Sequence, residues 1–229
     1  MPNYFDAGYM LQQMPVLLGY VHITLLIAFL SAVLGIIGGC IVAVIRFLKI
    51  PVLSQFLIGL TSFVRGMPIL VQMCLFCFGG PEILENLGQP SDLVSPITYI
   101  VFVFSVYVAI LSGEIIRGAI LSIPKGQIEA AAMMNMSAWS TYRRIIIPQA
   151  LMAAVLPLIN TVIGELKATS LAFNVGVIDM VAEVQLLAGF SQRYLELYVD
   201  VGIIYGVIVL LLSFMGQRME LYFGKQCRG

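Results

Sequence analysis

Residues 126–150 of this chain read GQIEAAAMMNMSAWSTYRRIIIPQA and separate two long apolar stretches. This part of the sequence carries Glu129, Arg143 and Arg144, in a protein in which only 10% of the residues are charged. It is too short and too polar to cross a bilayer, because a transmembrane helix needs about 20 mainly apolar residues. We therefore expect residues 124–144, called the polar segment below, to lie on a face of the protein that a separate soluble partner can grip.

The composition of the rest of the chain indicates an integral membrane protein. The chain has 229 residues, of which 60% are hydrophobic, and its mean hydropathy is +1.00. Soluble domains are only about 45–50% apolar and about one quarter charged. The net charge is zero, so nothing indicates a nucleic-acid partner. The four cysteines lie mostly in apolar runs without histidines nearby, and we predict packing roles for them and no metal site.

The apolar runs predict a single all-α transmembrane domain over residues 1–229, with five spans. These spans cover roughly residues 16–45, 52–78, 96–116, 145–166 and 197–215. Residues 171–190 are moderately apolar but contain Asp179 and Glu183, which predicts a re-entrant or interfacial piece. The first span is rich in glycine, and small residues let neighbouring helices approach closely. These glycines are Gly35, Gly38 and Gly39.

Basic residues predict the orientation of the spans. Nine of the twelve fall on one predicted side: Arg46, Lys49, Arg117, Lys125, Arg143, Arg144, Arg218, Lys225 and Arg228. The positive-inside rule makes that side cytoplasmic. The N-terminus is then outside, the C-terminus is cytoplasmic, and the polar segment faces the cytoplasm.

The second span contains the first candidate binding residues. Arg65 and Gly66 begin the sequence R-G-M-P, in which glycine and Pro68 interrupt the helix near its middle. Interrupted helices at membrane depth expose backbone groups that bind a solute where they line a cavity. A guanidinium group there can hold a carboxylate through two hydrogen bonds. The alternative is that Arg65 pairs with Glu114 or Glu165 and only braces the helices.

A second set of candidates lies at the end of the fourth span. Glu165, Lys167, Thr169 and Ser170 form a polar cluster in the sequence G-E-L-K-A-T-S-L. Residues two apart on a helix do not face each other, so a Glu165–Lys167 pair is disfavoured. Glu165 is a candidate partner for an amino group and Lys167 for a carboxylate.

Glu114 on the third span is a further candidate contact. Arg117 follows it by three residues, near the predicted cytoplasmic edge. This spacing also predicts a local salt bridge or a gate.

Motifs for chemistry by the chain itself are absent from the sequence. It contains no G-x-x-x-x-G-K-[ST], so ATP binding through a P-loop is excluded, and neither H-E-x-x-H nor G-x-S-x-G occurs. We therefore do not expect an enzyme.

The polar segment predicts two short helices joined by a bend. Gln127 to Met134 can form about two turns, and Asn135 tolerates a left-handed backbone at the bend. Ser137 or Ser140 can then cap a second helix. The first helix would present Glu129 and the small residues Ala130, Ala131 and Ala132 to a groove on a partner. The alternative is an amphipathic helix that lies on the lipid surface, for which Trp139 is suited but the alanine run is not.

These residues resemble a known family. Gly126, Gln127, Glu129, Ala130 and Ala131, followed by I-x-x-P-Q-A at residues 145–150, are similar to the EAA loop of binding-protein-dependent ABC importer permeases. Asn135 stands where that loop has glycine. R-G-M-P-I-L-V-Q at residues 65–72 and E-L-K-A-T-S-L-A at residues 165–172 resemble motifs of polar amino acid permeases. Met67 and Ala168 depart from those motifs, and S-L-A-F at residues 170–173 resembles members associated with cystine uptake.

The resemblance implies a five-helix type I importer fold and a multi-pass protein of the bacterial inner or plasma membrane. It implies a permease dimer of identical or different chains, two cytoplasmic ATPase subunits that bind ATP and magnesium, and an extracytoplasmic amino-acid-binding protein. It implies a substrate pocket near Arg65 and Glu165, and ATPase coupling through Gly126, Glu129, Ala130, Ala131 and Asn135. The competing interpretation is a channel or an assembly scaffold that works without an ATPase.

Overall fold

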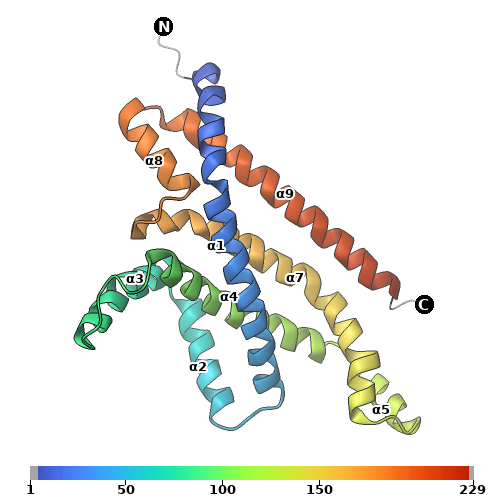
Figure 1. Cartoon of the computed structure of the whole chain (residues 1–229). Helices are drawn as coiled ribbons and strands as arrows, with labels where there is room; N and C mark the ends of the chain where they lie inside the picture. The colour runs from blue at the N-terminus through green and yellow to red at the C-terminus, as the bar shows by residue number, and fades with distance from the viewer. Residues whose placement is uncertain (1–4, 227–229) are drawn as a thin grey trace.

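The computed structural model describes residues 5–226, and the described part of the chain is helical without strands. The long helices are α1 (Ala7–Phe47), α4 (Pro96–Leu121), α7 (Ile147–Ala168) and α9 (Tyr194–Gln226). The shorter ones are α2 (Leu53–Gly66), α3 (Ile69–Asn86), α5 (Lys125–Met133), α6 (Ala138–Thr141) and α8 (Met180–Ser191). The start of α1 lies at one end of the molecule with α8 and the beginning of α9, and α5 lies at the opposite end (Figure 1).

Within the described residues, four stretches of helix are long and apolar enough to cross a membrane: Ala7–Phe47, Pro96–Leu121, Ala138–Val175 and Tyr194–Gly224. A fifth span results if α2 and α3 are counted together, because they are bent by 105° at a short break. The first helix begins well before the predicted residue 16. Asp6 caps it by accepting hydrogen bonds from the backbone N–H groups of Gly8 and Tyr9.

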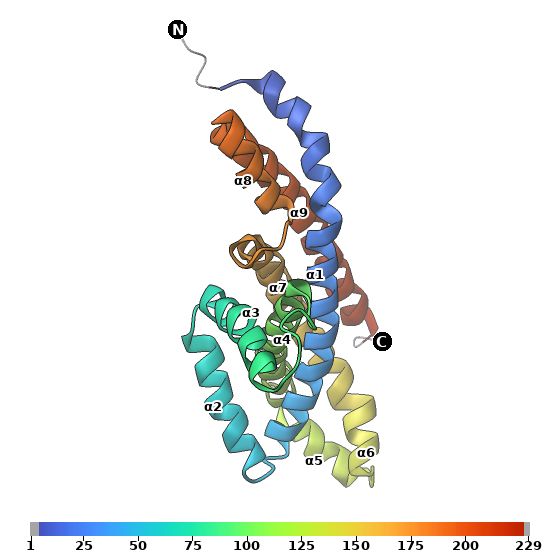
Figure 2. The same cartoon turned by 60° about the vertical axis from the view of Figure 1, so that its left-hand side comes forward.

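Helices α1 and α4 form the close-packed centre of the fold, and they cross in both views (Figures 1 and 2). A Cβ atom added at Gly35 would lie 2.5 Å from Cβ of Val108, and one added at Gly39 would lie 2.7 Å from Cβ of Ser112. The glycines therefore let the two backbones approach closely, which confirms the prediction made from the small residues of the first span.

The interruption predicted in the second span is the break between α2 and α3. Helix α2 ends at Gly66, and α3 begins at Ile69, directly after Pro68. The buried Gln72 closes this break, because its side-chain amide donates hydrogen bonds of 2.9 Å to the backbone oxygens of both Val64 and Met67. Those oxygens belong to the end of α2, where helical partners are missing.

Residues 169–191 form a turn and a short helix at the end of α7. Thr169–Val175 is a 3₁₀ helix, and Asp179 then caps α8 by accepting hydrogen bonds from the N–H groups of Val181 and Ala182. Buried apolar residues of α8 pack with Leu17 of α1 and Leu197 of α9. This explains why residues 171–190 are apolar without forming a full span.

The polar segment contains α5, α6 and the first part of the π helix Tyr142–Ile146. The sequence predicted that the fourth span starts at residue 145, but the structure joins α6, the π helix and α7 into one helical stretch. Pro148 lacks an N–H donor, and the turn before it is widened so that the N–H of Ile147 reaches the oxygen of Tyr142. The second half of the polar segment is therefore continuous with a long apolar helix.

Candidate functional site

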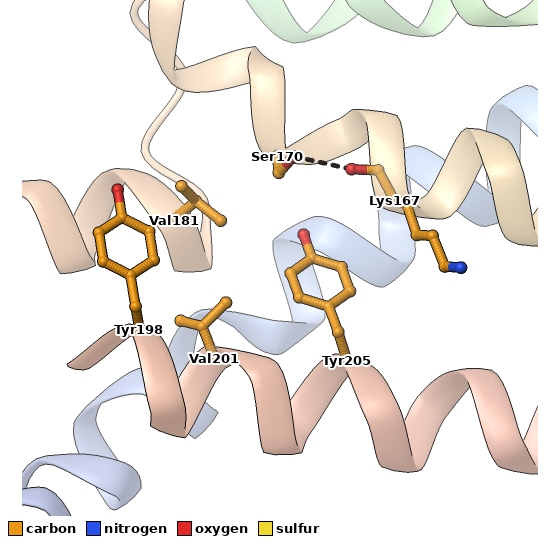
Figure 3. Close-up of a pocket in the computed structure, with 6 residues that line it drawn as sticks. All are labelled: Lys167, Ser170, Val181, Tyr198, Val201 and Tyr205. Atoms are coloured by element: carbon orange, nitrogen blue, oxygen red, sulfur yellow. Dashed lines mark hydrogen bonds between the residues drawn. The ribbon is translucent and has the colours of Figure 1, made fainter. Parts of the chain in front are cut away.

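A cavity of about 250 Å³ lies where the 3₁₀ helix leaves α7 and faces α8 and α9. It is lined by Lys167, Ser170, Val181, Tyr198, Val201 and Tyr205 (Figure 3). In this view the two tyrosine rings rise from α9, and their hydroxyl groups point toward the side on which Ser170 and Val181 lie. Lys167 and several hydroxyl groups therefore border a small, partly apolar space, and in this view the Lys167 ammonium points away from Ser170 and Tyr198.

The local backbone decides which of the predicted residues face this cavity. Lys167 is exposed, and Ser170 donates a 2.7 Å hydrogen bond to the backbone oxygen of Lys167 (Figure 3). Thr169 is fully buried instead, donates to the oxygen of Leu166, and lies 3.4 Å from the hydroxyl of Tyr205. Lys167 and Ser170 can thus contact a ligand, whereas Thr169 supports the turn and the position of Tyr205.

Glu165 lies inside the protein and does not line the cavity. It is fully buried, and one carboxylate oxygen accepts a 2.6 Å hydrogen bond from Ser31 of α1. The other oxygen has no partner within the described part of the chain. No ion pair joins Glu165 to Lys167 among the residues whose side chains are described, which agrees with their spacing on the helix.

Arg65 and Gly66 are both exposed at the end of α2. The ion pairs found among side chains 5–224 do not include Arg65, so the predicted bracing pair with Glu114 or Glu165 is not formed. The break itself is close to the end of α7, because Ile69 packs in the same apolar cluster as Ala168 and Leu171. The structure therefore brings the two predicted regions together, although Arg65 does not line the cavity.

Glu114 is engaged elsewhere, at the end of the molecule where α1 ends. It binds Arg117 at 2.9 Å and also Arg46 of α1. The predicted local salt bridge is confirmed and extended to a third residue. Both guanidinium groups occupy the carboxylate of Glu114, and Glu114 does not line the cavity at Lys167.

The bend in the polar segment has the predicted geometry. Asn135 adopts a left-handed backbone with φ of 55°. The N–H of Met136 donates to the oxygen of Ala131, and the N–H of Asn135 donates to the oxygen of Ala132, which is the hydrogen-bond pattern of a Schellman motif. Ser137 then caps α6 by accepting from the N–H of Ser140. Asparagine thus closes the helix where glycine is usual.

Two glutamines fasten α5 to α7. The amide of Gln149 donates to Gln127 at 2.6 Å and to the backbone oxygen of Ile145 at 2.9 Å. Gln127 donates in return to Gln149 at 3.1 Å. The end of α1 also reaches this region, because the rings of Phe47 and Tyr142 meet edge to face. Side-chain contacts therefore join α5, the start of α7 and the end of α1.

Helix α5 was predicted to present Glu129 and all three alanines to a partner, but not all of these residues are exposed. Glu129 and Ala130 are exposed, but Ala131 is only 4% exposed and faces its own chain. Consecutive helical residues are about 100° apart, so three alanines in a row cannot all face a partner. Gly126 is exposed, and a Cβ atom there would meet nothing within 4 Å. No contact within the described part of the chain therefore requires glycine at this position.

Sequence reasoning missed several residues of these sites. Three of them are glutamines in the quoted motifs: Gln72, Gln127 and Gln149. Their polar amide groups were the signal from which hydrogen bonds between elements could have been predicted. Tyr198 and Tyr205 carried no such signal, because tyrosines seven residues apart in an apolar run are also expected at membrane interfaces.

The opposite end of the molecule holds a small charge cluster. Arg193 binds Asp6 at 2.7 Å, lies 3.9 Å from Glu196 and stacks on the ring of Tyr9. The hydrogen bond from Arg193 lowers the pKa of Asp6 below its ordinary value of 3.8. The start of α1 is thereby tied to the turn between α8 and α9.

Residues 35–228 match the family described as "Binding-protein-dependent transport system inner membrane component". The chain belongs to this family. Its members are membrane permease subunits of ABC transporters and are not themselves enzymes. The described helices and the family together identify a multi-pass protein of the bacterial inner membrane with a type I importer permease fold.

Individual relatives cover nearly the whole chain. It is 37% identical to the "Probable amino-acid permease protein YxeN" of Bacillus subtilis, over 99% of both proteins. It is 35% identical to the "L-cystine transport system permease protein TcyL" of the same organism, over 96% of this chain and 92% of that protein. A crystal structure titled "an amino acid ABC transporter with histidines" is similar with a TM-score of 0.84 and 26% identity, over 95% of this chain and 99% of that one.

Proposed function

We propose that this chain is the permease subunit of an importer that moves a polar amino acid inward by alternating access. It would act with a second permease chain, two ATPase subunits that bind ATP and magnesium, and an extracytoplasmic binding protein. Amino acid and cystine permeases among the relatives support this class of substrate, and cystine is a specific candidate.

One observation carries the proposal. The helical stretch Ala138–Val175 runs without a gap from the polar segment to the cavity at Lys167 and Ser170. Its first part is fixed to α5 by the Gln127–Gln149 pair, and its last part forms one wall of the cavity. A force applied to α5 by a partner would therefore move the wall of the cavity through a rigid helix.

The polar segment is suited to a partner groove. Glu129 is exposed on α5, and Met133, Met134 and Trp139 expose 87%, 78% and 70% of their surface. An exposed apolar patch with a charged side chain beside it is typical of a protein contact. In the proposed cycle the ATPases close on ATP, move this segment, and open the cavity to the outside; hydrolysis returns it inward.

The cavity offers complementary groups for an amino acid. The Lys167 ammonium would bind the carboxylate, and the hydroxyl groups of Ser170, Tyr198 and Tyr205 would bind its remaining polar atoms. Glu165 would meet the amino group only if a motion of α1 against α7 separates it from Ser31. At the neighbouring α2–α3 break, Arg65 and Gly66 would contact the substrate on its way through the membrane.

The test is ATP-driven uptake of amino acids by the complete transporter in vesicles, with the binding protein supplied. Glu129→Ala is expected to lower the maximal rate at least about tenfold, because it removes the charged contact to the ATPase, worth about 1.5–3 kcal/mol. Glu220→Ala on α9 is the matched control and should transport normally. Unchanged uptake by Glu129→Ala, or uptake against a gradient without ATPase subunits, contradicts the proposal.

A further inference from the structure

A second cavity, of about 360 Å³, lies where α1 ends and α2 begins. Its polar lining consists of Arg46, Lys49, Ser54, Gln55 and Arg117. All five side chains carry hydrogen-bond donors, and three of them are cationic. It is formed by different residues from the cavity at Lys167.

The charges of this second cavity are not balanced. Arg46 and Arg117 share the single carboxylate of Glu114, and no ion pair of the described side chains involves Lys49. The Nε atom of Arg117 is buried and has no hydrogen-bond partner in the described part of the chain. Three cations and one carboxylate leave an excess of positive charge and at least one buried donor unsatisfied.

The loop that carries Lys49 has an unusual backbone. Lys49 and Val52 have φ angles of 51° and 65°, in the left-handed region that residues with a side chain disfavour. For Val52 this is a marked departure, because its side chain is branched at Cβ. Such a backbone persists only where the surroundings fix it, and here it places Lys49 on the wall of the cavity.

The stretch of chain that lines this cavity also exposes apolar side chains. Leu48, Val52 and Phe56 lie next to lining residues in the sequence and expose 62%, 78% and 64% of their surface. The loop lies at the same end of the molecule as α5 in both views (Figures 1 and 2). Cations at a helix end that are flanked by exposed apolar residues match the depth of phospholipid phosphates, with acyl chains just below.

We propose that this cavity binds the phosphate of an anionic phospholipid headgroup. A phosphate offers only acceptor oxygens, which suits a wall made of donors, and the exposed apolar residues would contact the acyl chains. The bound lipid would fix the loop between α1 and α2, and hence the base of the broken span. The site does not depend on the substrate or on the proposed transport cycle.

Lipid binding by the complete transporter tests this inference. The transporter with its ATPase subunits is placed in detergent, and fluorescent phosphatidylglycerol is titrated, with phosphatidylcholine as the neutral comparison. Lys49→Gln is expected to weaken phosphatidylglycerol binding about fivefold, the effect of about 1 kcal/mol for one basic residue near the headgroups. Lys49→Arg keeps the charge and should bind normally.

Arg218→Gln is the control for net charge, because Arg218 is an exposed basic residue on α9 that stacks on Phe214 outside the cavity. Normal binding by this variant, with loss in Lys49→Gln, supports the site. Equal loss in both variants, or equal binding of phosphatidylcholine, overturns it.

Two further measurements distinguish a bound phospholipid from other possible occupants of the cavity. Displacement of the lipid by inorganic phosphate alone would identify a site for a free anion and overturn the lipid assignment. Dissociation of the ATPase subunits in Lys49→Gln would identify a subunit contact and also overturn it. Uptake is not measured here, so failure of the transport proposal would leave the result unaffected.

Discussion

Two regions of this membrane protein pack their helices in different ways. One is the pair α1–α4, and the other is the α2–α3 break together with the end of α7. In the first pair, glycines bring two unbroken helices so close that an added methyl group would collide with the partner. In the second, helices stop inside the apolar part of the chain, and Gln72, Lys167 and Ser170 supply polar groups there. The unbroken pair provides a close-packed frame, and in the proposed function the broken helices are the places where the substrate binds.

The frame should be the part most sensitive to added volume. Gly39→Val would place a side chain against Ser112 and the backbone of Gly113, and overpacking costs about 1–3 kcal/mol or more. We expect loss of the folded complex, measured as the yield of a single species in size-exclusion chromatography. Gly59→Val is the matched control, because a Cβ atom at Gly59 meets nothing within 4 Å. Equal yields of the two variants would show that the α1–α4 contact is not the frame.

A substitution in the cavity at Lys167 should weaken substrate binding and leave folding of the complex unchanged. Lys167→Gln removes the ammonium group, and a charge-assisted hydrogen bond is worth about 1.5–3 kcal/mol. We expect the KM for uptake to rise at least about tenfold while the yield of the complex is unchanged. Lys167→Arg, which keeps the charge, should lose much less. A normal KM in Lys167→Gln would remove this residue from the substrate path.

A substitution at the break between α2 and α3 should affect both the stability of the complex and the rate of uptake. Gln72→Leu leaves the oxygens of Val64 and Met67 without their donor, and an unsatisfied buried group costs about 1–3 kcal/mol. A thermal unfolding scan of the complex should show a lower midpoint, together with slower uptake. Gln12→Leu, at an exposed position of α1, should show neither change. If both variants melt alike, the 105° bend does not depend on Gln72.

The smallest effect on stability is expected from the ion pair between Asp6 and Arg193, which joins the start of α1 to the turn between α8 and α9. Arg193 lowers the pKa of Asp6 below 3.8, so the ion pair contributes fully above that pH and is lost as the pH falls through the lowered pKa. The protection of the Gly8 and Tyr9 amides, which donate to Asp6, relative to their intrinsic exchange rate at each pH should therefore fall only in acid. In Arg193→Gln this loss of protection should begin at a higher pH. The same onset in both proteins would show that the pair does not act on Asp6.

Much of this arrangement could be predicted because the relevant signals are local. The left-handed Asn135, the cap at Ser137 and the break before Pro68 follow from the backbone preferences of single residues. The close approach at Gly35 and Gly39 followed from small residues in an apolar run. Each of these needs only its neighbours in sequence.

The remainder depended on contacts between distant residues. Glu114 could be paired with Arg117 from spacing, but Arg46 reaches it only because α1 packs along α4. The burial of Glu165 against Ser31 and the approach of Tyr205 to the end of α7 have the same origin. The helical stretch that contains the fourth predicted span, residues 145–166, begins earlier, at Ala138, because the π helix joins α6 to α7.

The central claim is that ATP binding by a partner moves the wall of the cavity through the helix that begins in the polar segment. The most direct measurement is the labelling of Ser170→Cys by a membrane-impermeant thiol reagent, in a protein without the four native cysteines. In vesicles of one orientation, the account predicts that the side from which this position is labelled switches when ATP is trapped, and that Glu129→Ala abolishes the switch. Labelling from the same side at the same rate in both states, or a switch that survives in Glu129→Ala, would contradict the account.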